Sequence, residues 1–209
     1  SHKMPQSATV QRTQEQRREQ SERRMLRAAI GLFARQGYQR TTLGQVGRKA
    51  GYTAGLVSHK FGSKEGLLLA AVKRISRRFL HDQLGSAIQQ ANAAASLNNF
   101  IELYLREASL REGPMRALYV IMGEALGGVP EIRKPIADLN AGTRDTVARI
   151  IRQGIRDGEF NAAVDADAAA ALIIGALRGM VMQHLIDPRR VALSPMRAAM
   201  QATVMASLR

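Results

Sequence analysis

Apolar residues recur every three or four positions along most of the chain, a spacing typical of amphipathic α-helices. The first stripe contains Leu26, Ala29, Ile30 and Phe33, and Gly37 ends it. Later stripes, separated by glycine and proline, predict helices over 43–50, 54–60, 63–84, 86–94, 97–111, 114–126, 130–157, 165–186 and 194–208. No window alternates as a strand would, so the pattern predicts an all-α fold.

Two short helices follow each other closely near residue 50. Thr42 and Gln45 have the spacing of a capping box, which starts the first of them. Gly51 gives the turn a residue that tolerates positive φ, and Thr53 can cap the second helix. Ser63 can cap the long helix that follows. These signals predict a helix, a tight turn and a second helix.

The two short helices need matching apolar side chains if they are to pack at a steep angle. Val46 and Ala50 are expected to contact Val57, with Tyr52 and Phe61 closing the ends. The outer side of the second helix is then free to meet a partner. In helix-turn-helix motifs this part of the second helix enters the major groove of DNA. A plain helical hairpin inside an all-α core is the alternative interpretation.

Charge is distributed very unevenly along the chain. Residues 1–80 hold 17 Lys or Arg and four Glu, so +13 of the total net charge of +14 lies there. This bias indicates a surface for a polyanion, with nucleic acid favoured over an anionic membrane. Residues 1–20 are rich in Gln and Arg and nearly free of apolar side chains, which predicts a disordered basic arm.

Several functional classes are disfavoured by what the sequence lacks. With no cysteine and four scattered histidines, neither a disulfide framework nor a metal site is expected. No catalytic residues, phosphate-binding loop or cofactor site can be assigned. The segment 168–186 is apolar but carries Arg178 at its centre, so we expect a buried helix of a soluble protein rather than a membrane span. Without a secretory signal, a cytoplasmic location is expected.

The stretch 28–68, AAIGLFARQGYQRTTLGQVGRKAGYTAGLVSHKFGSKEGLL, resembles the N-terminal domain of the TetR family of bacterial transcriptional regulators. The resemblance implies a three-helix DNA-binding domain at 21–66 and a larger helical ligand-binding and dimerisation domain at 67–209. The helix at about 63–84 would join them. It further implies a homodimer on a near-palindromic DNA operator, controlled by a small-molecule effector and most often acting as a repressor.

The same resemblance assigns roles to residues around the turn. Thr41 or Thr42, Thr53 and Lys64 would contact phosphate. Bases or backbone would meet the outer side of the second helix, at Ala54, Gly55, Leu56, Ser58 and His59. The family often has Tyr where Ser58 and Lys60 stand, and Lys60 could replace one of them as a point charge.

Candidates for the effector pocket are apolar or aromatic residues of the central helices: Phe100, Tyr104, Met115, Tyr119 and Met122. A mostly apolar or mixed ligand is favoured, because the chain has no Trp and few aromatics for a cage around a quaternary ammonium. Glu124 is the acidic residue in an otherwise apolar run. It would meet a cationic ligand, pair with Arg116, or lie on an exposed face.

Small residues on one helix suggest where two subunits meet. Gly175 and Gly179 stand four apart, and Arg178 and Met182 lie on the same helix. We expect these residues at a dimer interface, with Arg178 in an ion pair across it; ordinary packing within one chain is the alternative for the glycines.

Two further points stay open at this level. The cationic run Lys73, Arg74, Arg77 and Arg78 is interpreted as a solvated or salt-bridged face, with DNA contact as the alternative. For the whole chain, the alternatives to a regulator are a small helical enzyme, an anionic-membrane-surface protein, or a non-specific DNA-compacting protein.

Overall fold

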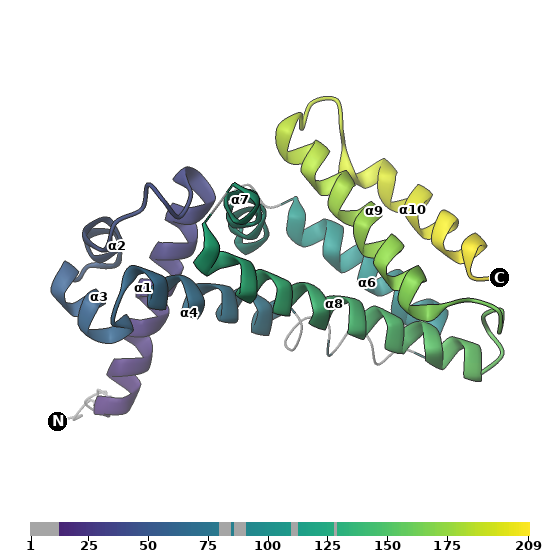
Figure 1. Ribbon diagram of the computed structural model, residues 1–209, viewed down its shortest axis with the longest axis horizontal. Helices are drawn as coiled ribbons and strands as arrows, with labels where there is room; N and C mark the ends of the chain where they lie inside the picture. Colours follow the sequence, from purple (N-terminus) through teal and green to yellow (C-terminus); the bar gives the residue numbers. More distant parts are fainter. Residues whose placement is uncertain (1–12, 80–84, 86–90, 110–112, 128) are drawn as a thin grey trace, which may run out of the picture.

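The computed structural model describes residues 13–79, 85, 91–109, 113–127 and 129–209. Within these ranges the regular structure is helical and contains no strand, so the all-α prediction is confirmed. The helices are α1 (Gln14–Gln36), α2 (Leu43–Ala50), α3 (Ala54–Phe61), α4 (Lys64–Arg77), α6 (Ala93–Ala108), α7 (Pro114–Leu126), α8 (Pro130–Arg156), α9 (Ala166–Ile186) and α10 (Leu193–Ser207) (Figure 1).

The molecule is elongated, with the three N-terminal helices at one end (Figure 1). There α2 packs on α1, and α3 packs on α2 and on α4. The long helices α4 and α8 lie side by side along the molecule. At the other end α9 and α10 pack against each other and cover α6 and α8. The helix α7 lies between the two ends and contacts both α1 and α8.

The first helix begins earlier than its apolar stripe. Thr13 and Gln16 form a complete capping box: the Thr13 hydroxyl accepts from the Gln16 amide at 3.2 Å, and the Gln16 side chain accepts from the Thr13 amide at 3.0 Å. These bonds satisfy backbone donors that a helix start leaves without partners. The predicted disordered arm 1–20 is therefore wrong for residues 14–20, while its first twelve residues lie outside the described residues.

The boundaries of the central helix α6 differ from the predicted range 97–111: the helix ends at Ala108, and residues 110–111 lie outside the described residues. Asn92 caps α6 by accepting from the Ala95 amide at 2.8 Å, so α6 starts at Ala93, four residues before the predicted position. The predicted helix 86–94 is thus wrong at its end, and residues 86–90 lie outside the described residues. Residues 80–84, the end of the predicted helix 63–84, also lie outside the described residues. The last four helices agree with prediction to within one residue at each end.

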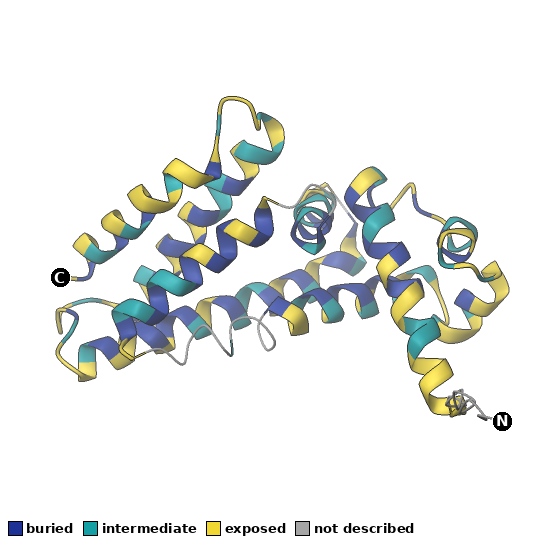
Figure 2. Ribbon diagram, turned by 180° about the vertical axis from the view of Figure 1, so that it is seen from behind, coloured by how far each residue is buried: buried dark blue, intermediate teal, exposed yellow. Residues whose placement is uncertain are grey.

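Buried side chains from all these helices form one continuous core. Its largest fully buried members include Phe33 in α1, Leu68 in α4, Phe100 in α6 and Ile151 in α8. Figure 2 shows buried residues along the faces where helices meet and exposed residues on their outer faces. Removal of this apolar surface from water is the main contribution to stability of such a fold.

The helix α9 is less buried than predicted. Among the described helices it is the one with the length and hydropathy to cross a membrane. Only 28% of its apolar 18-residue stretch is buried. Its inner face packs into the core through Ile174, Leu177 and Val181. The outer face carries Leu172 and Met182, which are 75% and 52% exposed. The prediction of a buried helix therefore holds for one face only.

Candidate nucleic-acid interface and effector cavity

The turn between α2 and α3 is built from caps and two glycines. Thr42 and Gln45 exchange both bonds of the predicted capping box, at 3.2 and 2.9 Å. Gly51 ends α2 with φ of 81°, the left-handed conformation that glycine adopts without strain. A Cβ on Gly47 would stand 2.8 Å from the carbonyl oxygen of Tyr52. Gly47 therefore allows the turn to approach α2 closely.

The packing of the two short helices agrees with prediction. Val46 and Val57 are fully buried, and Ala50, Tyr52 and Phe61 are partly buried against the same core. Because these contacts occupy the inner side of α3, its opposite side is left on the surface of the molecule.

The outer side of α3 is open to solvent. Thr53 caps the helix by accepting from the Leu56 amide at 3.2 Å. After it, Ala54, Gly55, Leu56 and His59 are exposed, and Ser58 is half-buried. The first turn carries small side chains, which let another molecule approach the backbone closely. This is the face that the sequence assigns to DNA.

The two adjacent threonines before α2 differ completely in exposure. Thr41 is 1% exposed, and its hydroxyl donates to the Gly37 carbonyl at 2.6 Å. Thr42 is exposed at the start of α2. Of the two candidates for phosphate contact, Thr41 is therefore excluded, because its side chain is enclosed by the protein.

Both predicted lysine contacts are already engaged within the chain. The Lys60 ammonium lies 2.9 Å from a Glu22 carboxylate oxygen. The Lys64 ammonium donates to the Gln39 carbonyl at 2.9 Å and lies 4.5 Å from the centre of the Tyr38 ring. A phosphate would have to compete with these contacts or share them.

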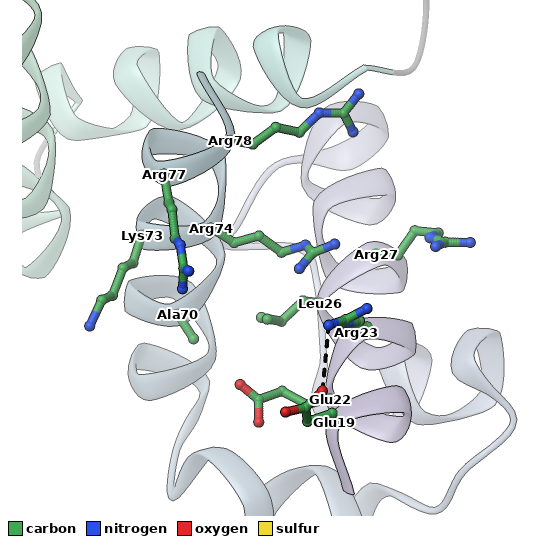
Figure 3. A pocket seen from close by; sticks show the side chains of 10 residues that line it. All are labelled: Glu19, Glu22, Arg23, Leu26, Arg27, Ala70, Lys73, Arg74, Arg77 and Arg78. Atoms are coloured by element: carbon green, nitrogen blue, oxygen red, sulfur yellow. Dashed lines mark hydrogen bonds and ion pairs between the residues drawn. The ribbon is translucent and has the colours of Figure 1, made fainter. Parts of the chain in front are cut away.

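A basic groove runs between α1 and α4, with a volume of about 810 Å³ (Figure 3). It contains the whole predicted cationic run together with Arg23 and Arg27; the lining residues are Glu19, Glu22, Arg23, Leu26, Arg27, Ala70, Lys73, Arg74, Arg77 and Arg78. Arg23 pairs with Glu19 at 3.4 Å. Within the described part of the chain, Lys73 and Arg77 make no ion pair and are exposed. Lys73 and Arg77 are thus solvated, while contact of the run with DNA stays a prediction.

A small enclosed cavity lies where α4, α6, α7, α8 and α9 converge. Its volume is about 10 Å³, and it is lined by Ile75, Ser76, Phe79, Tyr104, Met115, Leu118, Leu139, Thr143 and Arg178. Tyr104 and Met115 were predicted as pocket residues, and both line it. Phe100 is fully buried beside it and packs on the Tyr104 ring, with ring centres 5.9 Å apart.

Two phenols meet next to this cavity. The hydroxyl oxygens of Tyr104 and Tyr119 are 2.9 Å apart. Burial raises the pKa of both phenols, while the Arg178 guanidinium acts in the opposite direction on each. Desolvation is the larger effect, so both hydroxyls stay protonated at neutral pH and can donate hydrogen bonds.

Arg178 is half-buried on α9 and reaches toward α8. Its Nη2 donates to the Asn140 side-chain oxygen of α8 at 2.6 Å, and its buried Nε has no hydrogen-bond partner among the described residues. The place of Arg178 at a subunit interface stays a prediction. The other predicted interface residues do lie outward: Gly175 and Met182 are exposed and Gly179 is half-buried.

Glu124 holds α7 to the end of α1. Its carboxylate accepts from the Tyr38 amide at 2.8 Å and the Gln39 amide at 3.0 Å. Arg116, the partner proposed for Glu124, instead donates to the Ala34 carbonyl at 3.2 Å. The pairing of Glu124 with Arg116 is therefore wrong, and its partners are backbone amides instead. Its partners lie more than 80 residues away in sequence, where no local pattern identifies them.

Met122, the last pocket candidate, lines a separate groove between α7 and α8. This groove has a volume of about 300 Å³ and is mostly apolar, with Met122, Ala125, Leu126, Arg133, Ile136, Ala137 and Asn140 along it. Asn140 lines the groove and also binds Arg178 of the enclosed cavity. In the described part of the chain, no three His, Asp or Glu side chains are grouped to hold a metal ion.

Two family models match this chain. The model described as bacterial regulatory proteins, tetR family, matches residues 25–71, which include α2 and α3. The model described as the C-terminal part of BetI-type transcriptional repressors matches residues 93–209, more than half of the chain. Together they cover the candidate DNA-binding face and helices α6 to α10, while the cavity-lining part of α4 lies between the two matches.

Individual relatives agree with these models. The fatty acid metabolism regulator protein of Bacillus subtilis (strain 168) is 24% identical over 170 residues, which cover 80% of this chain and 86% of that protein. The HTH-type transcriptional regulator BetI of Brucella suis biovar 1 is 37% identical over 71 residues, covering 34% and 35%. A solved transcriptional regulator from Saccharomonospora viridis in complex with choline has a TM-score of 0.78 and 25% identity, covering 89% and 96%.

Proposed function

The chain belongs to the TetR family of bacterial regulatory proteins, and on that premise we propose how its parts act as a ligand-responsive repressor. Family membership makes it a DNA-binding transcriptional regulator whose partners are operator DNA, a second copy of itself and a small-molecule effector. The proposal concerns which residues carry each role. The helices α1 to α3 would form the DNA-binding domain, ending near residue 66, and α4 would join it to the effector domain.

The observation that carries the proposal is the exposed outer side of α3. A recognition helix must offer side chains that reach base edges while its other side is fixed by packing. Here Val57 fixes the inner side, and Leu56, Ser58 and His59 stand on the outer side. Thr42 and Thr53, at the starts of α2 and α3, would contact phosphates there.

The coupling between effector and operator would run through α7 as well as α4. The Glu124 bonds to Tyr38 and Gln39 attach α7 to the loop before α2. Lys64 at the start of α4 binds the same Gln39 residue through its carbonyl. A displacement of α7 or α4 by an effector would therefore move the DNA-binding domain. The effect on operator affinity is expected to correspond to about 1–3 kcal/mol, the usual size of such coupling.

Dimerisation would use the outer faces of α9 and α10. Leu172, Met182 and Ile186 give α9 an exposed apolar stripe, with Gly175 between them. In a two-fold dimer the same face is presented by both subunits, so such a stripe meets its own copy. Two recognition helices held in this way would read half-sites about 34–36 Å apart on one side of the duplex.

Selection of bound DNA from a random pool, followed by gel shifts, tests the function. We expect a near-palindromic site bound at least about 10³-fold more tightly than random DNA. Equal affinity for all sequences would instead support a DNA-compacting protein. Absence of DNA binding at physiological salt would contradict the proposal altogether. It would favour a membrane-surface protein or an enzyme. A cytoplasmic location, where operator DNA lies, is part of the proposal.

A further inference from the structure

The enclosed cavity contains a cationic group that lacks part of its hydrogen bonding. Arg178 reaches in from α9, and its Nη2 donates to the Asn140 amide oxygen at 2.6 Å. Its Nε is buried and has no acceptor. Buried donors are nearly always paired, and an unpaired one on a charged group is especially costly. The guanidinium also forms a hydrogen bond with the Tyr104 side chain. Among the described residues no acceptor reaches Nε, which leaves that donor open to a ligand.

The geometry of a guanidinium indicates what would satisfy it. Nε and one terminal nitrogen form a side-by-side pair that a carboxylate binds with its two oxygens. Asn140 offers a single neutral oxygen and occupies one position of the pair. A carboxylate would take both positions, displace the Asn140 amide and neutralise the charge. Asn140 then acts as a substitute acceptor when the carboxylate is absent.

The rest of the lining fits an oxyanion with an apolar body. The Ser76 hydroxyl and the Tyr104 phenol line the cavity, and the Tyr104 hydroxyl shares a hydrogen bond with Tyr119 beside it. The Thr143 hydroxyl also lines the cavity and donates to the Leu139 carbonyl. The remaining lining side chains are apolar: Ile75, Phe79, Met115, Leu118 and Leu139. None of the lining residues is acidic. Glu107 is buried on α6 but does not line the cavity, and Glu124 is bound to the backbone of α1 and the following loop.

Resting on the function proposed above, we infer that the effector of this protein is an organic acid whose carboxylate binds Arg178. A volume of about 10 Å³ holds no more than one water-sized group, so the surrounding helices must separate when the acid binds. The apolar groove between α7 and α8 is the place for the body of the acid, because Asn140 borders it and contacts Arg178. Release of Asn140 would then reposition α8, which packs on α4.

Matched probes test the charge preference directly. Two pairs share an apolar body and differ in the sign of the head group: octanoate with octyltrimethylammonium, and benzoate with phenyltrimethylammonium. Calorimetry on the full chain is expected to show at least one carboxylate binding about tenfold or more tightly than its cationic partner. The inference is overturned if both ammonium compounds bind more tightly, or if neither carboxylate binds.

Variants assign the preference to Arg178. Arg178→Gln and Asn140→Asp each lower the net charge by one. The first removes the guanidinium, and the second gives Arg178 an internal carboxylate partner. Both should remove the preference for the carboxylate probe. Arg189→Gln makes the same change of charge on an exposed loop and should leave it intact. Arg178→Lys keeps the charge without the paired donors and should retain part of the preference. An unchanged preference in Arg178→Gln would overturn the inference.

Operator gel shifts on the same proteins separate this inference from the proposed function. Sequence-specific binding by the parent and by Arg178→Gln, with no discrimination between probes, would refute the acid effector alone. Loss of specific DNA binding by the parent would refute the regulator itself. Retained operator binding by the variants also shows that they are folded.

Discussion

At the residue scale, two glycines of α2 have opposite significance. A Cβ on Gly47 would lie 2.8 Å from the Tyr52 carbonyl oxygen and 2.9 Å from the Thr53 carbonyl carbon. Both are backbone atoms of the turn and cannot rotate away. A Cβ on Gly44 would meet nothing closer than the Thr42 hydroxyl at 3.9 Å. One glycine is therefore required by packing, and the other only lowers helix propensity.

We expect Gly47→Ala to destabilise the protein by about 1–3 kcal/mol, the usual cost of overpacking. Gly44→Ala should stabilise it by up to about 1 kcal/mol, because alanine loses less backbone entropy in a helix. Chemical denaturation followed by circular dichroism measures both. Equal effects of the two substitutions would show that the turn does not approach α2 as closely as described.

His59 and Lys64 are expected to contribute differently to DNA binding. His59 is exposed on α3, so His59→Ala should change the preferred base at one position and reduce discrimination there by about 1–3 kcal/mol. Lys64→Gln should weaken binding to all sequences and lower the slope of log affinity against log salt by about one. Competition binding at several salt concentrations distinguishes the two. If both variants behave alike, α3 does not face the bases.

The adjacent threonines show the limit of sequence reasoning about single residues. Thr42 has a recognisable partner three residues on, so its place at a helix start could be predicted. No local feature of the sequence distinguishes Thr41 from Thr42. The burial of Thr41 depends on the fold of the preceding turn. The inward position of Arg178 was missed for the same reason, since it depends on how α9 is rotated against α8.

At the scale of elements, helix ends were predictable wherever a cap or proline marks them. Thr53, Ser63, Pro114 and Pro130 each stand at or next to the start of the helix they predicted. The start of α1 was missed because Gln14 and the residues after it show no apolar stripe. The contact between the adjacent helices α2 and α3 could be predicted, but contacts that join residues distant in sequence could not.

The attachment of α7 to α1 is such a contact, and it can be tested. We expect Glu124→Gln to weaken the bonds to the amides of Tyr38 and Gln39, because a neutral acceptor replaces a carboxylate. Loss of about 1.4 kcal/mol would raise the exchange rate of these amides about tenfold. Hydrogen–deuterium exchange with mass spectrometry reads this segment.

Glu131→Gln provides the matched control for that experiment. Glu131 starts α8 and lines a surface hollow with Tyr38, but it makes no hydrogen bond or ion pair in the described part of the chain. Exchange at residues 38 and 39 should be unchanged in this variant. Faster exchange in both variants would assign the effect to general charge around Tyr38 and remove the support for α7 as a coupling element.

At the scale of the whole molecule, charge and apolar surface lie at opposite ends. The cationic surface lies on α1 and α4, in the groove between them, near the DNA-binding face. The exposed apolar stripe of Leu172, Met182 and Ile186 lies on α9, at the far end of the elongated chain. The cationic surface attracts a polyanion over a long range. The apolar surface is exposed to water in a monomer and is covered when a second subunit packs on it. A dimer formed at α9 leaves both α3 helices free for DNA.

This arrangement predicts that a charge on α9 separates the subunits. Leu172 is 75% exposed in the single chain, and a two-fold dimer buries two copies of it. Leu172→Glu would place two unpaired carboxylates in that interface, so we expect the dimer dissociation constant to rise at least about 100-fold. Leu126→Glu, at an 85% exposed position on α7, should leave the dimer intact. Sedimentation velocity over a range of concentrations measures both, and gel shifts should show the Leu172 variant losing its preference for a full operator over a half-site. A Leu172→Glu protein that stays dimeric would mean that subunits meet elsewhere.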